Sequence, residues 1–134
     1  MTLFLLDTNI LSHLMRNPRG IVRAALDRVP DNSVVTSVIV AAEIRFGAAK
    51  RGSASLLRQA EVVLGDMSVR PFDVPADQVY ADIRRALEVA GKPIGANDLL
   101  IAAHALSLDA ILITDNTREF ERVPGLKIEN WLRG

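Results

Sequence analysis

The 134-residue sequence contains no cysteine, which excludes both disulfide bonds and thiolate metal sites. Aromatic residues make up only 4% of the chain, so the core must be built from aliphatic side chains. No apolar run approaches the roughly 20 residues that a membrane-spanning helix needs, and the N-terminus lacks a signal-peptide pattern. The sequence therefore predicts a single globular domain, residues 1–134, in the cytoplasm.

Net charge is also absent, but the charges are distributed unevenly along the chain. Residues 1–58 hold eight Lys and Arg residues against four acidic residues, so the remainder of this neutral chain is acidic. Most of the basic residues are arginines, whose planar guanidinium suits phosphate groups. Solvent-exposed helix faces give the same pattern, so charge alone leaves a nucleic-acid partner open.

Short apolar segments alternate with amphipathic ones, and this pattern is typical of a parallel sheet covered by helices. We expect strands at residues 3–6, 33–36 and 110–114, an edge strand at 69–74 and a short last strand at 126–128. Helices are expected at 10–16, 21–29, 38–50, 55–67, 75–90 and 98–106, with one helical turn at 117–120.

The first strand runs without alternation from Leu3 to Leu6 and leads directly into Asp7. Thr8 and Asn9, which follow, are good N-cap residues for the next helix. Open α/β sheets bind their ligands at the carboxyl ends of the strands, where Asp7 falls. Two interpretations of Asp7 remain open: an anchor for a metal ion, or a simple cap of the next helix.

Glu43 lies within the predicted helix 38–50. Ile39 and Val40 lie one turn before it, and Phe46 and Gly47 lie one turn after it, which places Glu43 on an apolar stripe. A buried carboxylate needs a partner, because unpaired burial costs several kcal/mol or forces protonation. The alternative is a Glu at the edge of the stripe whose carboxylate reaches water.

Two further acids occupy comparable positions. Asp98 begins a nearly all-apolar helix, where it is either functional or stabilises the helix N-terminus, although Asn97 could cap that helix by itself. Asp115 follows the fourth strand as Asp7 follows the first. If these two strands are neighbours, both acids converge with Glu43 and Asp98 in one cleft. Clustered carboxylates repel one another, and a hard divalent cation such as Mg²⁺ or Mn²⁺ relieves that repulsion.

Other catalytic arrangements fit less well. His13 and His104 are not at metal-ligand spacing, and we expect them on the surface or in the core. Ser37 has no evident His partner and is expected to cap the helix 38–50. The sequence contains no glycine-rich phosphate loop.

Four stretches of the chain, in order, resemble the PIN-domain ribonucleases and, within them, the VapC toxins of bacterial toxin–antitoxin pairs. The stretches are LLDTNIL at 5–11, AAEIRFG at 41–47, IGANDLLIAAHA at 94–105 and ITDNTREF at 113–120. The resemblance covers essentially the whole length. It implies a three-layer α/β fold of the PIN type, with a mostly parallel sheet of order 3-2-1-4-5 flanked by helices.

The resemblance also implies a Mg²⁺-dependent endoribonuclease, with Mn²⁺ as the alternative ion. It assigns metal-site roles to Asp7, Glu43 and Asp98. A fourth position follows the fourth strand, where we rank Asp115 and Asn116 above Glu119. Secondary candidates around these acids are Thr8, Asn9 and Thr114, and candidates for contacts with RNA phosphates are Arg45, Lys50, Arg51 and Arg118.

Toxins of this type inhibit translation, form homodimers or larger assemblies, and are neutralised by a cognate VapB-type antitoxin. Segments 21–29 and 55–67 are candidates for the antitoxin groove, with ordinary core packing as the alternative. Residues 116–126 most resemble members that cut the anticodon loop of initiator tRNA. Two other functions stay open: a non-cleaving regulator of the same fold, and a nuclease that acts on DNA.

Overall fold

The computed structural model describes residues 1–133 and is organised around a five-stranded sheet. The strands are β1 (Leu3–Leu6), β2 (Val34–Ser37), β3 (Ser68–Arg70), β4 (Ala110–Ile113) and β5 (Ile128–Glu129). All four neighbouring pairs are parallel and the spatial order is β3-β2-β1-β4-β5, which confirms the predicted topology. Strand β1 is therefore central, with Leu5 beside Val35 on one neighbour and Leu112 on the other.

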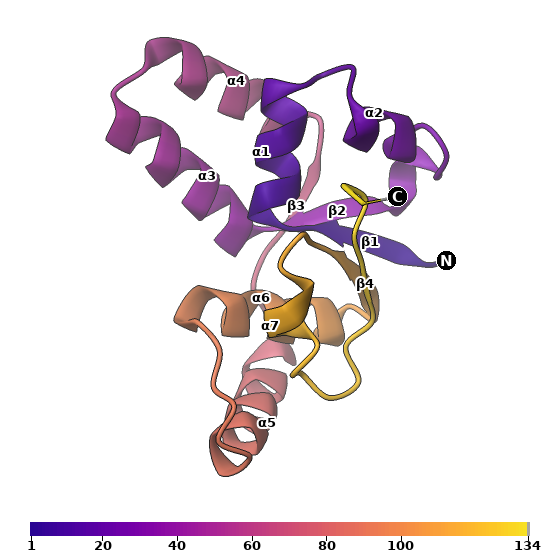
Figure 1. Ribbon diagram of the computed structural model, residues 1–134, viewed down its shortest axis with the longest axis vertical. Helices are drawn as coiled ribbons and strands as arrows, with labels where there is room; N and C mark the ends of the chain where they lie inside the picture. The colour runs from indigo at the N-terminus through magenta and orange to yellow at the C-terminus, as the bar shows by residue number, and fades with distance from the viewer. Residues whose placement is uncertain (134) are drawn as a thin grey trace.

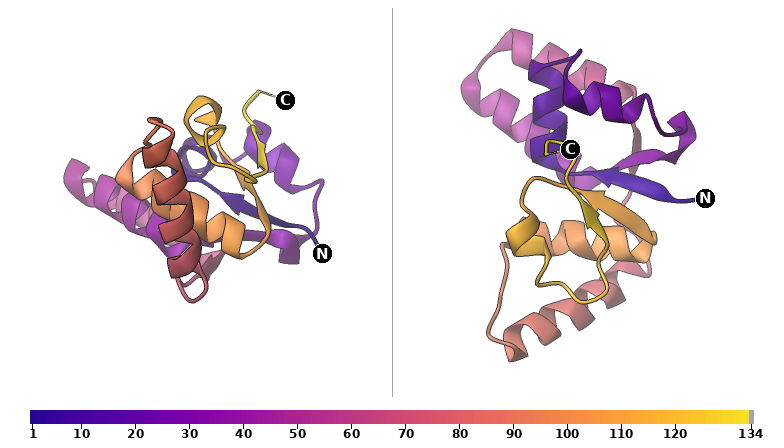
Figure 2. Two further views of the ribbon diagram at one scale, coloured as in Figure 1. Left: turned by 90° about the horizontal axis from the view of Figure 1, so that it is seen from below. Right: turned by 45° about the vertical axis from the view of Figure 1, so that its right-hand side comes forward.

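Helices cover both faces of this sheet, which explains why its inner strands are apolar throughout. One face carries α1 (Thr8–Arg16), α2 (Ile21–Leu26), α3 (Val38–Arg51) and α4 (Ala54–Gly65), and the other carries α5 (Ala76–Val89), α6 (Ala96–Ser107) and α7 (Thr117–Phe120) (Figure 1). Figure 2 shows the same three layers from two further directions. The core is aliphatic, as expected, with Phe120 its one fully buried phenyl ring within residues 1–133. No helix in that range is both long and apolar enough to cross a membrane.

Most element boundaries fall within a few residues of those predicted, and the exceptions have local causes. A turn of 3₁₀ helix at Asp31–Ser33 delays the start of β2 by one residue. Strand β3 ends at Arg70 rather than continuing to residue 74, because Pro71 has no N–H to donate to a neighbouring strand. Its position at the edge of the sheet agrees with the prediction.

Helix α3, which carries Glu43, is fixed at both ends. The Ser37 hydroxyl accepts a hydrogen bond of 3.0 Å from the backbone N–H of Ile39, as expected for an N-cap. At the other end Gly52 adopts the left-handed conformation, with φ of 63°, which a glycine takes without steric cost. The helix therefore presents the Glu43 side chain from a rigid support.

The expectation that Ser37 lacks a His partner is wrong. Its Oγ lies 2.7 Å from His104 Nδ1, and the two residues are 0% and 1% exposed. Since Ser37 already accepts from Ile39, we assign its O–H as the donor to His104. Burial lowers the pKa of His104, which keeps the ring neutral. The pair ties α6 to the start of α3 inside the core, where no substrate reaches it.

Candidate active site

The site lies where β1 and β4 end side by side. Leu6 pairs with Ile113 in the sheet, so the next residues, Asp7 and Thr114, are also neighbours. The Thr114 hydroxyl donates a hydrogen bond of 2.7 Å to Asp7 Oδ2, and both residues are buried. The strand order therefore brings the ends of β1 and β4 together as predicted, but the residue that contacts Asp7 is Thr114 and not Asp115.

Asp7 is both the cap of α1 and a buried carboxylate, so the two interpretations of this residue are not exclusive. Its Oδ1 accepts a hydrogen bond of 2.7 Å from the Thr8 N–H, and its Oδ2 accepts one of 3.3 Å from Asn9 Nδ2. Thr8 and Asn9 are thus not the caps expected from the sequence. Burial raises the pKa of Asp7, the nearby Glu43 charge adds to this, and the hydrogen bonds from Thr114, Thr8 and Asn9 only partly offset it.

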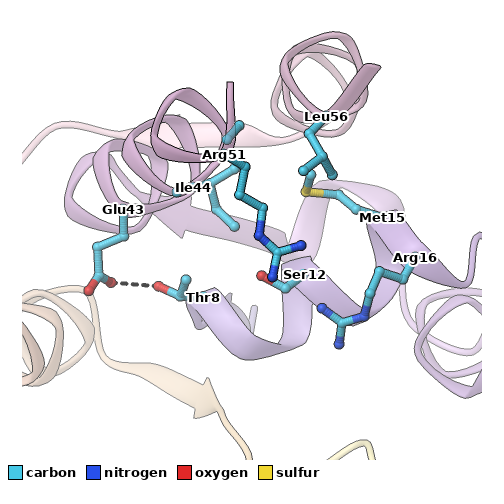
Figure 3. A pocket seen from close by; sticks show the side chains of 10 residues that line it. Thr8, Ser12, Met15, Arg16, Glu43, Ile44, Arg51 and Leu56 are labelled. Atoms are coloured by element: carbon cyan, nitrogen blue, oxygen red, sulfur yellow. Dashed lines mark hydrogen bonds between the residues drawn. The ribbon is translucent and has the colours of Figure 1, made fainter. Parts of the chain in front are cut away.

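Glu43 reaches the same site from α3. Its Oε1 accepts a hydrogen bond of 2.5 Å from the Thr8 hydroxyl (Figure 3). Its Oε2 accepts one of 3.2 Å from Asn97. Thr8 therefore links two acids, through its N–H to Asp7 and its hydroxyl to Glu43. Asn97 serves Glu43 rather than capping α6, whose N-cap is Gly95.

The surroundings of Glu43 differ from the predicted apolar stripe. Phe46, one turn further along α3, is 68% exposed, and Gly47 is exposed as well. Glu43 itself is half-buried, at the boundary between the core side of the helix and the cleft. The alternative of an edge position is the better description, and the carboxylate is held by hydrogen bonds rather than by burial.

Asp98 and Glu119 complete a group of four acids. Burial, a hydrogen bond with Glu119, and the charges of Glu119, Asp7 and Glu43 raise the pKa of Asp98 to about 7. Although burial acts against it, the pKa of Glu119 is lowered by hydrogen bonds from the Gly95 N–H at 2.6 Å and from Asn116 Nδ2 at 2.7 Å. Of these two carboxyls, Asp98 is therefore the one that keeps its proton to higher pH.

The ranking of Asp115 above Glu119 does not agree with this geometry. Asp115 Oδ1 accepts hydrogen bonds from Asn130 at 2.8 Å and Arg133 at 3.3 Å, which lower its pKa. Its carboxylate is thus engaged with the C-terminal segment. Asn116 faces the site, but it acts as a donor to Glu119.

The donor set suits a hard divalent cation. Within residues 1–133, no three acidic or histidine side chains are close enough to enclose a metal ion directly. Mg²⁺, however, usually keeps several of its waters and takes only one or two carboxylates as direct ligands. An all-oxygen group in which burial, and then the neighbouring acids, raise the pKa of Asp98 fits such an ion.

The four predicted phosphate contacts separate into different environments. Arg45 forms an ion pair with Glu61, with nitrogen–oxygen distances of 2.9 and 3.0 Å. Lys50 and Arg118 are exposed. Of the four, only Arg51 lines a pocket of about 240 Å³ that also includes Glu43. Arg16 lines this pocket as well, although it was not among the predicted phosphate contacts.

Comparison with known proteins identifies the family. The PIN domain model matches residues 4–126 of the chain. This chain is a PIN domain protein of the VapC type. Ribonuclease VapC1 of Haemophilus influenzae is 36% identical over 98% of this chain and 99% of the relative. The tRNA(fMet)-specific endonuclease VapC of Shigella flexneri is 37% identical over 96% of this chain and 97% of the relative.

A solved structure agrees with these matches. The crystal structure of VapBC2 from Rickettsia felis, bound to a DNA fragment from their promoter, contains a chain with a TM-score of 0.89 and 30% identity. The match covers 97% of this PIN domain and 99% of that chain. The predicted fold and the predicted family are both confirmed.

The raised pKa of Asp98 predicts that this PIN domain is destabilised by its own acids when no metal is present. The folded protein holds the proton up to about pH 7, whereas an unfolded Asp loses it near 3.8, so stability falls as the pH rises between these values. Because Asp98 is half-exposed, solvent screening reduces the effect, and we expect Asp98→Asn to gain about 1–2 kcal/mol at pH 8 and nothing near pH 4.

Thermal unfolding in EDTA at several pH values measures this difference. Asp82→Asn, which removes an exposed carboxylate from α5, is the matched control and should show no such pH dependence. A gain that is equal at pH 4 and pH 8 would contradict the electrostatic cause.

Proposed function

We propose that this protein is a Mg²⁺-dependent endoribonuclease, the toxin of a toxin–antitoxin pair, with Mn²⁺ as an alternative ion. The observation that carries the proposal is the meeting of Asp7, Glu43, Asp98 and Glu119 at one edge of the sheet. Relatives of nearly the same length are named ribonucleases, which supports a reaction at phosphodiester bonds. Without a bound cation, the negative charge of these four acids would repel a polyanionic substrate.

Asp7 and Asp98 would hold the cation, with Glu43 and Glu119 reaching it directly or through water. When bound, a divalent cation supplies Lewis acidity at the scissile phosphate and makes water a better nucleophile. The chain's own contribution is orientation. Thr114, Asn9 and the Thr8 N–H fix both oxygens of Asp7, and the Thr8 hydroxyl fixes Glu43. Such preorganised carboxylates need little rearrangement during the reaction.

Transfer RNA is the proposed substrate. The Shigella flexneri relative is named as specific for tRNA(fMet), and residues 116–126 of this chain resemble members that cut the anticodon loop of initiator tRNA. Cleavage there would inhibit translation in the cytoplasm. The excess of basic residues in the first 58 positions supports a polyanionic ligand.

The direct test is to incubate the purified protein with initiator tRNA, other structured RNA and single-stranded DNA, each with Mg²⁺, with Mn²⁺ or with EDTA. We expect cleavage of the tRNA only when a divalent ion is present. Cleavage of DNA but not RNA would assign the protein to the DNA nucleases, and no cleavage of any substrate would favour a regulator that only binds.

A VapB-type antitoxin is the proposed partner, acting on a toxin homodimer. A groove of about 440 Å³ lies between α1, α2 and α4, and its apolar lining comprises Leu14, Leu26, Val34, Val62, Val63 and Met67. Val62 is 65% exposed there and adds to the apolar surface that a partner chain could cover. Both segments predicted for this role, 21–29 and 55–67, contribute to the groove. The similar structures are VapBC complexes, which supports such a partner.

A further inference from the structure

The pocket lined by Arg16 and Arg51 lies next to the group of four acids, and Glu43 belongs to both. It measures about 240 Å³ and lies between α1, α3 and α4. Glu43, with Thr8 beside it, is the acidic side of the pocket. Ser12, Arg16 and Arg51 line the rest of its polar surface. Figure 3 shows the two arginine side chains extending toward Ser12, on the side of the pocket away from the Glu43 carboxylate. The pocket therefore joins an acidic site to a basic one.

Within residues 1–133, four other arginines form ion pairs with acids of the chain, and these two do not. Arg23 and Arg84 form ion pairs with acids one turn away on their own helices, Asp27 and Glu88. Arg16 and Arg51 form no ion pair or side-chain hydrogen bond within the part of the chain that the structure describes, residues 1–133. Their guanidiniums are available to an external anion, and the planar fork of arginine matches the oxygens of a phosphate.

Gly47 lines this pocket without contributing a side chain. It lies inside α3, where glycine is unfavourable because it loses more conformational freedom on folding than alanine. A Cβ at this position would meet no atom within 4 Å, so no contact in the folded chain requires glycine. Gly47 lines the pocket, and a larger side chain there would take up part of its volume.

We propose that Arg16 and Arg51 form a subsite for a backbone phosphate of the RNA strand, adjacent to the phosphate that is cleaved. This proposal rests on the endoribonuclease function proposed above and adds the direction in which the strand leaves the acidic site. The strand crosses from the acids, past Thr8 and Glu43, to the two arginines between the C-terminal turns of α1 and α3. The apolar side chains of Met15 and Leu56 border the path of its sugar and base.

The first test measures RNA binding at several salt concentrations. A fluorescent single-stranded RNA is titrated with the protein in EDTA, so that cleavage cannot occur, between low and physiological KCl. Each lost phosphate contact lowers the slope of log K against log salt by about 0.7 for a single strand. Because both arginines are proposed to hold one phosphate, we expect the Arg16→Gln/Arg51→Gln double variant to lower the slope by about that amount. Each single variant should lower it by less. Arg85→Gln is the matched control, because it removes an exposed charge from α5. Helix α5 covers the face of the sheet opposite α1, α3 and α4 (Figure 1).

The second test closes the pocket without changing any charge. Gly47→Leu should raise KM for RNA about five- to tenfold, the loss expected for weakened charge-assisted contacts, while kcat changes little. Gly65→Leu is the matched control, because that helical glycine also has open space around its Cβ and does not line the pocket. Both variants should fold at least as well as the parent protein, since leucine is the better helix former.

The outcomes distinguish a failure of the phosphate subsite from a failure of the proposed endoribonuclease function. If the parent protein cuts RNA and the double arginine variant keeps both its salt slope and its KM, the subsite is wrong and the nuclease function stands. If the double variant instead loses only its hold on a co-expressed antitoxin, the pocket belongs to that protein partner and the RNA subsite is again wrong. If the parent protein neither binds nor cuts RNA, the nuclease function itself fails.

Discussion

Asp7→Asn is expected to lower RNA cleavage by about 10²–10³-fold, the usual cost of removing one preorganised charged group from a reaction site. Asp7 is the most deeply buried of the four acids, at 3% exposure, and both its oxygens are held by hydrogen bonds. The substitution keeps the shape of the side chain but removes its charge. An amide cannot compensate the charge of a divalent cation, so the apparent affinity for Mg²⁺ should fall together with the rate.

The fold should survive this change. The amide oxygen introduced at position 7 can still accept from the Thr8 N–H, while the new NH₂ group would face the Thr114 hydroxyl, which already accepts from the Asn116 N–H. The hydrogen bond from Thr114 and the longer one from Asn9, both to the same oxygen, are lost. Each costs on the order of 1 kcal/mol or less. Removal of a buried charge whose pKa is raised by burial offsets part of that cost. Thermal unfolding in EDTA should therefore show a transition close to that of the parent protein.

Single-turnover cleavage of a labelled tRNA measures the effect, with Asp82→Asn on α5 as the control of equal charge change. Toxicity on expression without an antitoxin should disappear in parallel. If Asp7→Asn cuts at the parent rate while remaining folded, Asp7 is a structural cap only, and the proposed site must be abandoned.

The part of the site that could be predicted from the sequence is the part that strand order determines. Parallel strands end at one edge of a sheet, so an acid after β1 and a polar residue after β4 had to meet once the two strands were neighbours. The apolar runs before Asp7 and before Thr114 were sufficient to place both strands. The helical positions of Glu43 and Asp98 then brought these acids to the same edge.

The identity of the fourth acid could not be predicted in this way. It depends on which way the turn after β4 directs each side chain, and that direction is set by distant partners. The Asp115 N–H donates to Asn9, and its carboxylate is held by Asn130 and Arg133. No local pattern in residues 113–120 encodes contacts with residues 9, 130 and 133. The Ser37–His104 contact, between residues 67 positions apart, was missed for the same reason.

Glu119→Gln is expected to lower cleavage about 10–100-fold, whereas Asp115→Asn should leave it nearly unchanged. Glu119 lies against Asp98 and raises its pKa. It also accepts a hydrogen bond from the Gly95 N–H at the start of α6, the helix that carries Asp98, and so helps to position Asp98. Asp115 affects neither the pKa nor the position of Asp98, because its carboxylate is directed to the C-terminal segment. Its loss should appear instead as a small decrease in thermal stability.

A pH profile distinguishes the role of Glu119 charge from simple support of the loop. The Glu119 carboxyl contributes to the raised pKa of Asp98, both by its hydrogen bond and by its charge. In Glu119→Gln the pKa of Asp98 should therefore decrease, and metal-dependent activity should begin at lower pH than in the parent protein. A variant that only loosened the turn would lose rate equally at every pH. Should Asp115→Asn, rather than Glu119→Gln, abolish cleavage, the ranking made from the sequence would be restored, and the arrangement of α7 described here would not be the one that reacts.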